Sequence, residues 1–258
     1  MTLREPPAMP TIGAVIPVWN GARYLAEAIS SLLAQQATWS QIIVVDDGST
    51  DASAEIAGAF GPPVTVQRQP NRGIAAARNA GVRALSCSLV AFLDADDLRV
   101  ANSLAPQIAR FADDASLELC FGAMQQFVSP ELDAKTRARL VCPAAPGPAC
   151  TSGTMVARRE VFVRYGLFDE SLRAGEFIDW ITRAKAARVK FSIVEDLVML
   201  RRLHGANHGI VRRDSYDDYV RVVKRALDAK RAAKVNEGSA APNAPDPNRG
   251  NDAGRPKS

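Results

Sequence analysis

Three carboxylates fall within four positions at the end of an apolar run. The run covers residues 88–93 and is typical of a buried strand, and Asp94, Asp96 and Asp97 follow it directly. Carboxylates this close repel one another when they are ionised. A hard divalent cation would relieve the repulsion, because such ions bind carboxylate oxygens. Solvation in an exposed turn would relieve it as well, so this stretch alone indicates either a cation site or a solvated turn.

Two further polar clusters also follow predicted strands. Residues 11–18 form a short apolar run that ends just before Asn20, which can cap the following helix, and residues 41–45 form a second run that ends at Asp46 and Asp47. In parallel sheets, ligands bind outside the carboxyl ends of the strands. We therefore expect these side chains to lie on the same sheet edge as the later group of three aspartates.

Strand and helix patterns alternate through the first hundred residues with short connections. This alternation predicts an α/β fold, with a Rossmann-like, mostly parallel central sheet flanked by helices. The second half of the chain is less regular. Strands are expected there at residues 117–121, 151–156, 189–193 and 198–203, and a helix at residues 176–187.

The composition is that of a soluble globular protein. Hydrophobic residues make up 47% and charged residues 23% of the 258 residues, and there is no apolar stretch of membrane-spanning length. The first residues lack the apolar core of a secretory signal. None of the four cysteines has zinc-ligand spacing, and we expect Cys87 and Cys120 to be small core residues. These features predict a protein of the reducing cytoplasm.

The two ends of the chain differ from the rest. Residues 211–234 are predicted to form a basic amphipathic helix, which could contact phosphates or the inner membrane surface, although a solubilising role is the simpler interpretation. Residues 235–258 have almost no apolar side chain to bury and are predicted to be disordered. Residues 1–10 are expected to be flexible. No nucleic-acid partner is expected.

Four motifs occur in a fixed order along the chain, and two more follow them. Together they resemble the family 2 glycosyltransferases, which have the GT-A fold. The resemblance covers residues 11–208 and implies a single glycosyltransferase domain at residues 11–210, with a nucleotide-binding half at 11–100 and a smaller acceptor half at 101–210. The motifs are Ala14-Val-Ile-Pro-Val-Trp-Asn-Gly21, Ile43-Val-Val-Asp-Asp-Gly-Ser-Thr-Asp51, Asn71-Arg-Gly-Ile-Ala-Ala-Ala-Arg-Asn-Ala-Gly81, Phe92-Leu-Asp-Ala-Asp-Asp97, Gly166-Leu-Phe-Asp-Glu170 and Arg201-Arg-Leu-His-Gly-Ala-Asn207.

The resemblance implies a nucleoside-diphosphate sugar as donor, with a UDP-hexose favoured. Asp46 would read the base, Asp94 would approach the ribose or the metal, and Asp96 would bind Mn²⁺ or Mg²⁺ at the diphosphate. His204 would complete the metal shell or contact the diphosphate, and Asp97 would order the loop. The implied nucleotide-binding residues are Pro17, Val18, Asn20, Asp46, Asp47, Arg78, Asp94 and Ala95.

Two other implied roles concern the leaving group and the aromatic residues. Arg201 and Arg202 could neutralise the leaving diphosphate. Trp19 and Trp180 could be walls of the acceptor site, but core positions are the expectation.

One feature departs from the family pattern. Many members carry a Glu-Asp pair at the start of a helix in the second half, and one of these carboxylates is the base in an inverting transfer. Phe177 replaces the Asp here, while Glu176 and Asp179 remain on one helix face. Arg183 lies four residues after Asp179 and could hold it as an ion pair. Glu176, at the open helix start, is therefore favoured as the catalytic base, with Asp179 as the second candidate.

Three classes of function are compatible with these residues. An inverting glycosyltransferase is the leading interpretation. A nucleotidyltransferase would share the sheet and the carboxylates, but the glycine- and lysine-rich loop typical of that class is missing after the first strand. Phe177 gives some weight to a degenerate, non-catalytic module that binds sugar nucleotides or a partner. The acceptor is not specified: a glycan, a lipid-linked glycan, a peptide and a small natural product all fit.

Overall fold

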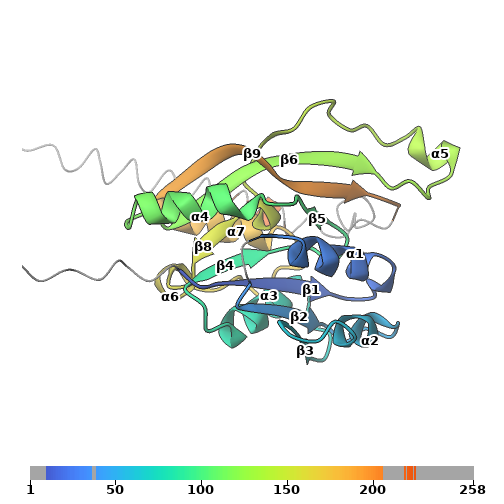
Figure 1. Ribbon diagram of the computed structural model, residues 1–258, viewed down its shortest axis with the longest axis horizontal. Helices are drawn as coiled ribbons and strands as arrows, with labels where there is room; N and C mark the ends of the chain where they lie inside the picture. The colour runs from blue at the N-terminus through green and yellow to red at the C-terminus, as the bar shows by residue number, and fades with distance from the viewer. Residues whose placement is uncertain (1–9, 37–38, 206–217, 219, 223, 225–258) are drawn as a thin grey trace, which may run out of the picture.

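A nine-stranded mixed sheet forms the centre of the protein (Figure 1). The computed structural model describes residues 10–36, 39–205, 218, 220–222 and 224. The strand order is β3-β2-β1-β4-β8-β6-β9-β5, and β7 pairs with β6. The strands are β1 (Ile12–Val18), β2 (Gln41–Asp46), β3 (Val64–Arg68), β4 (Leu89–Phe92), β5 (Leu98–Arg99), β6 (Leu119–Val128), β7 (Gly147–Ala149), β8 (Val156–Arg158) and β9 (Phe191–Leu203). The helices are α1 (Ala22–Leu33), α2 (Ser53–Gly58), α3 (Ile74–Ala84), α4 (Leu104–Asp113), α5 (Ala134–Arg137), α6 (Val161–Arg164) and α7 (Glu176–Ala186), with one 3₁₀ turn, η1 (Ser152–Thr154).

The parallel part of the sheet contains β3, β2, β1 and β4, as the alternating pattern predicts. Val18 at the end of β1 pairs with Asp46 at the end of β2, and β4 runs parallel to β1 on its other side. The carboxyl ends of these strands therefore lie along one edge. Beyond β4 the sheet is mixed, because β8 runs antiparallel to both β4 and β6.

Helices cover both faces of the sheet. On one face, α1, α2 and α4 pack into a core that includes Leu25 and Leu104. On the other face, α3, α6 and α7 pack into a second core that includes Trp180. The α3 helix lies close to β1 because Gly81 has no side chain: a Cβ atom there would lie 2.3 Å from a methyl carbon of Val15.

Two sequence predictions for the second half are wrong in detail. Residues 151–156 are not a strand, because the chain first makes the η1 turn and only then enters β8. The two strands expected at 189–193 and 198–203 are one long strand, β9, which pairs with β6 along its length despite two shifts in register. Pairing with β6 resumes on both sides of a bulge at residues 194–196, at Ile193 with Phe121 and at Leu197 with Ala123, so the two predicted strands form one.

Few residues of the predicted C-terminal helix lie in the part that the structure describes, and these are helical. Asp218 accepts a hydrogen bond from the backbone N–H of Arg173 at 2.9 Å, and Val222 is buried. The predicted flexible N-terminus, apart from Pro10, and the predicted tail at 235–258 lie outside the described residues. None of the helices in the described ranges has the length and apolar character needed to cross a bilayer.

Candidate functional site

Asp46 ends β2 at the carboxyl edge, with its side chain fully buried. One carboxylate oxygen accepts the backbone N–H of Ser49 at 2.9 Å, and the other forms an ion pair with Nε of Arg68 at 2.8 Å. Arg68 lies at the end of β3, beside Asp46 in the strand register. The sequence analysis did not single out Arg68, and the signal that could have found it is its place at the end of the neighbouring parallel strand.

Asp47 fastens the end of β2 to the start of α3. It accepts hydrogen bonds from the side chain of Gln69 at 2.7 Å and from the backbone N–H groups of Arg72 and Gly73 at 2.9 and 2.8 Å. Gly73 has a positive φ of 91°, a backbone conformation that favours glycine. These three donors occupy the buried Asp47 carboxylate, so Asp47 supports the connection between β2 and α3.

Asn20 does not cap α1. Its side-chain oxygen accepts the backbone N–H of Thr50 at 2.8 Å, and its own N–H donates to the hydroxyl of Ser49 at 2.9 Å. The N–H of Ala22, at the start of α1, donates instead to a carboxylate oxygen of Asp51 at 3.0 Å. The predicted cap is wrong because the backbone of Asn20 is left-handed, with φ of 52°, and directs the residue toward the loop at residues 49–51.

The other residues predicted around the nucleotide have mixed exposure. Pro17 and Val18 are buried within β1, and Ala95 is partly buried against the core on the α1 side. Trp19 is 45% exposed, so its expected core position is wrong. Trp180 is fully buried, and its core position is confirmed.

Arg78 joins the two halves of the candidate site. Its guanidinium donates to Asp94 at 2.7 Å and to Glu176, and the side chain is only 3% exposed. Burial alone would lower the pKa of Arg78, but the two carboxylates outweigh burial and raise it. The sequence placed Arg78 near the nucleotide but gave no sign of the contact with Glu176, which lies 98 residues further along the chain.

The loop after β4 brings Asp96 to His204 at the end of β9. Nε2 of His204 lies 2.9 Å from a carboxylate oxygen of Asp96. Asp94 and Asp96 are partly exposed, with side chains 38% and 31% accessible. Asp97 is buried and accepts the backbone N–H of Arg202 at 2.9 Å, so it orders the loop as predicted. Burial, and then repulsion from its two neighbours, raises the pKa of Asp97 well above its ordinary value.

The two candidate bases both have arginine partners. Asp179 forms the predicted ion pair with Arg183 at 2.9 Å. The expectation that Glu176 is unpaired is wrong, because it is buried against Arg78. Phe177 points into the core, where it packs on Phe121 and Trp180. Because each carboxylate has an arginine partner, ion pairing does not distinguish the two candidates. The choice of Glu176 as the base stays a prediction.

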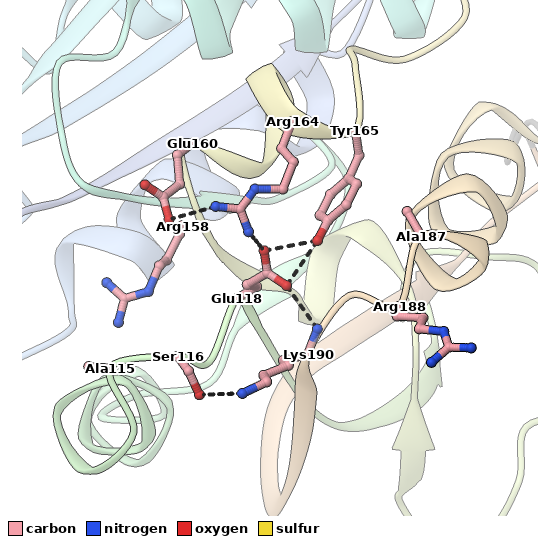
Figure 2. Close-up of a pocket in the computed structure, with 10 residues that line it drawn as sticks. All are labelled: Ala115, Ser116, Glu118, Arg158, Glu160, Arg164, Tyr165, Ala187, Arg188 and Lys190. Carbon is pink, nitrogen blue, oxygen red and sulfur yellow. Dashed lines mark hydrogen bonds and ion pairs between the residues drawn. The ribbon is translucent and has the colours of Figure 1, made fainter.

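A separate hollow of about 660 Å³ lies at the opposite edge of the sheet. Arg158, which lines it, pairs with the first residue of β4, whereas Asp94 follows the last residue of that strand. The lining residues are Ala115, Ser116, Glu118, Arg158, Glu160, Arg164, Tyr165, Ala187, Arg188 and Lys190 (Figure 2).

Polar contacts within the protein occupy the centre of this hollow. Glu118 accepts hydrogen bonds from Arg164, from the hydroxyl of Tyr165 and from the backbone N–H of Lys190 (Figure 2). The ammonium of Lys190 donates to Ser116 at 2.9 Å. These contacts tie the end of α6 to the chain just before β6 and just before β9, which gives the hollow a structural role.

Comparison with known proteins gives one consistent result. The family model described as Glycosyl transferase family 2 matches residues 14–165. An uncharacterised glycosyltransferase of Rickettsia prowazekii is 27% identical over 81% of this chain and 70% of its own length. The succinoglycan biosynthesis protein ExoO of Rhizobium meliloti is 32% identical over 70% of this chain and 58% of its own length.

The fold is similar to that of solved structures. The crystal structure of S. aureus TarS 1–349 in complex with UDP-GlcNAc superposes with a TM-score of 0.68 at 19% identity, over 85% of this chain and 66% of the TarS chain. A second crystal structure of the same TarS region, in complex with UDP, gives a TM-score of 0.60. At this level of identity the similarity establishes the GT-A fold alone.

Proposed function

Because the chain belongs to glycosyl transferase family 2 and is a glycosyltransferase of GT-A fold, we propose that it moves a hexose from a UDP-hexose to an acceptor with inversion. The observation that carries this proposal is the joining of the two halves of the site. Arg78 binds Asp94 on the donor side and Glu176 on the acceptor side at once. Such a contact holds a donor-binding loop and a candidate base in a fixed relation, which an in-line displacement needs.

The donor would bind along the carboxyl edge of β1, β2 and β4. Asp46 is proposed to read the base when the donor displaces Arg68, the 59% exposed arginine that pairs with its buried carboxylate. Pro17 and Val18 would form the floor beneath the base. The exposed indole of Trp19 at the same edge offers a surface on which a base can stack. Asn20 and Asp47 would act by shaping the loops, since their side-chain oxygens already accept hydrogen bonds from the protein. The TarS complexes with UDP-GlcNAc and UDP support a nucleotide-sugar donor.

Mn²⁺ or Mg²⁺ would be held by Asp96, Asp94 and His204. Carboxylate oxygens suit both ions, and an imidazole nitrogen is a further donor. No group of three or more His, Cys, Asp or Glu side chains converges as a metal cage within the described ranges. The protein therefore supplies an incomplete set of ligands, which the diphosphate oxygens of the donor would complete. When bound, the ion would screen the charge of the leaving diphosphate.

The acceptor half would contribute the base. Glu176 is proposed to take the acceptor proton, and Asp179, held by Arg183, to position the acceptor or the helix. The acceptor itself is proposed as one of four classes: a glycan, a lipid-linked glycan, a peptide or a small natural product. Contact of the basic C-terminal segment with an anionic membrane surface is proposed for the second of these.

A donor screen followed by calorimetry tests the proposal. The protein is incubated with UDP-hexoses and Mn²⁺, and UDP release is measured with and without candidate acceptors. Calorimetry then compares UDP affinity in Mn²⁺ and in EDTA for the wild type and for Asp96→Ala. We expect the metal dependence to disappear in Asp96→Ala, because the diphosphate then meets an incomplete cation site.

A matched control is Glu160→Ala, which removes an exposed carboxylate at the opposite edge of the sheet. It should leave UDP affinity unchanged in both buffers. If Asp96→Ala binds UDP as the wild type does in Mn²⁺ and in EDTA, the metal role of this loop is wrong.

A further inference from the structure

Arg202 has a buried position that the sequence did not predict. It lies in β9, two residues before His204, and its side chain is only 4% exposed. The guanidinium lies between two aromatic rings, 4.6 Å from the ring centre of Tyr24 and 4.8 Å from that of Phe127. Burying a charged group costs free energy because the group loses its bound water. Hydrogen bonds and aromatic ring faces offset that loss here. Arg202 is therefore built into the protein rather than presented to a leaving diphosphate.

The hydrogen bonds of Arg202 connect separate segments of the chain. Its Nε donates to the backbone carbonyl of Asp96 at 3.0 Å, and a terminal nitrogen donates to Glu27 of α1 at 2.7 Å. Its backbone N–H donates to the carboxylate of Asp97 at 2.9 Å. One residue of β9 thus holds the loop after β4 from two sides and fastens it to α1.

His204 also holds this loop. Asp96 is bound through its backbone carbonyl by Arg202 and through its carboxylate by His204. Because Arg202 and His204 are two residues apart, both contacts come from one short piece of chain. The position of that piece relative to α1 determines where the Asp96 carboxylate lies.

We propose that Arg202 is a positioning residue for the donor diphosphate. It fixes Asp96 relative to His204, so that their oxygen and nitrogen atoms are in place before the cation and diphosphate arrive. The inference rests on the proposed metal site, and it adds a residue that touches neither the ion nor the substrate. Groups that orient metal ligands in this way commonly change metal affinity by about ten- to a hundredfold when they are mutated.

Lysine cannot replace arginine in this position. The planar guanidinium presents its faces to two rings while nitrogens on its rim donate in different directions. A lysine ammonium is a single compact head, so it cannot bond the Asp96 carbonyl and Glu27 and also fill the space between Tyr24 and Phe127. Arg202→Lys therefore keeps the positive charge but loses the combination of hydrogen bonds and ring contacts that the guanidinium makes.

The test compares the effect of Mn²⁺ on UDP affinity in three proteins by calorimetry. The control is Arg158→Lys, because Arg158 also donates to a backbone carbonyl, that of Leu117, and lies over an aromatic ring, that of Phe111, but at the opposite edge of the sheet. We expect Arg202→Lys to bind UDP in EDTA with the same affinity as the wild type. The increase in UDP affinity on adding Mn²⁺ should be about ten- to a hundredfold smaller than in the wild type. Arg158→Lys should keep the full gain.

Removing the side chain of Glu27 provides a milder variant in case Arg202→Lys does not fold. The variant used for this purpose is Glu27→Ala, because a glutamine amide oxygen could still accept the hydrogen bond from Arg202. The Glu27 side chain is 59% exposed, so its loss should not unfold the protein, but it removes one anchor of the guanidinium. We expect a smaller reduction of the Mn²⁺-dependent gain in the same direction.

The outcomes separate the two proposals. A wild type whose UDP affinity does not respond to Mn²⁺ or Mg²⁺ overturns the proposed metal site itself. A wild type that responds, with Arg202→Lys keeping the full response, overturns the positioning role alone. The same conclusion follows if Arg202→Lys is unfolded and Glu27→Ala keeps the full response, or if Arg202→Lys weakens UDP binding equally in EDTA and in Mn²⁺.

Discussion

Replacing Glu176 with glutamine tests whether this carboxylate is the base that takes the acceptor proton. Glutamine has nearly the same shape, and its amide oxygen can still accept a hydrogen bond from Arg78, but it cannot take up the proton. Loss of a general base costs about a hundred- to ten-thousandfold in rate. At about 1.4 kcal/mol for each tenfold, this is about 2.8–5.6 kcal/mol of activation free energy. We expect kcat for acceptor-dependent UDP release to fall by that factor.

The structure also determines the effect of this substitution on stability. Glu176 is 7% exposed and Arg78 is 2% exposed, so the pair is buried. Removing the sole partner of a buried charge costs about 3–5 kcal/mol. Arg78 keeps its ion pair with Asp94, and the amide replaces the carboxylate, so we expect a loss of about 1.5–3 kcal/mol, the range for one hydrogen bond to a charged group. Urea denaturation measures this loss, which would leave a typical domain folded.

Asp179→Asn is the matched control for this experiment. It makes the same chemical change one turn further along α7, at a carboxylate that is 4% exposed and bound to Arg183. We expect it to lose comparable stability while keeping kcat within about tenfold of the wild type, which is 1.4 kcal/mol. UDP affinity in Mn²⁺ should stay within the same limit for both variants. Normal turnover in Glu176→Gln with loss in Asp179→Asn would reverse the assignment, and normal turnover in both would show that neither is the base.

Two other predictions concern packing and protonation. Gly81→Ala should destabilise the protein by about 1–3 kcal/mol in urea denaturation, because the new methyl group would lie 2.3 Å from Val15. Gly58→Ala in α2, where nothing lies within 4 Å, should be neutral or gain up to about 1 kcal/mol, and equal effects of the two changes would contradict the close approach of α3 to β1. The pKa of Glu131 should be about 2, because hydroxyl groups of Ser129 and then of a tyrosine donate to its carboxylate. The stability from this lowered pKa is present above the ordinary value of 4.5 and is lost as the pH falls toward 2, and an NMR titration of the carboxyl carbon with a midpoint near 4.5 would refute it.

Much of the parallel half of the fold follows from the sequence. Apolar runs with short polar interruptions predicted β1, β2, β3 and β4 and the helices between them, because periodicity reports which face of an element is buried. The end of each strand also predicted which edge carries the polar side chains. The order of motifs then identified the family, which the match over residues 14–165 confirms.

The second half was harder to predict because its strands depend on distant partners. The sequence indicates a break between residues 193 and 198, yet pairing with β6 on both sides of a bulge at residues 194–196 makes β9 one strand. The η1 turn likewise interrupts what reads as a strand. Strand propensity depends on the neighbouring strand and on packing, so a local window gives weak evidence for such segments.

The sequence by itself determined which side chains stand at the carboxyl edge, since that depends only on where each strand ends. Only the tertiary structure decided which of them are partners. Arg78 meets Glu176 across 98 residues, and Asp96 meets His204 across 108. These contacts depend on how β9 lies along β6 and how the start of α7 approaches α3, and both arrangements are set by the packing of whole elements. The sequence therefore predicted Glu176 at an open helix start, whereas the packing of the two halves joins Glu176, the proposed base, to Asp94 through the buried Arg78.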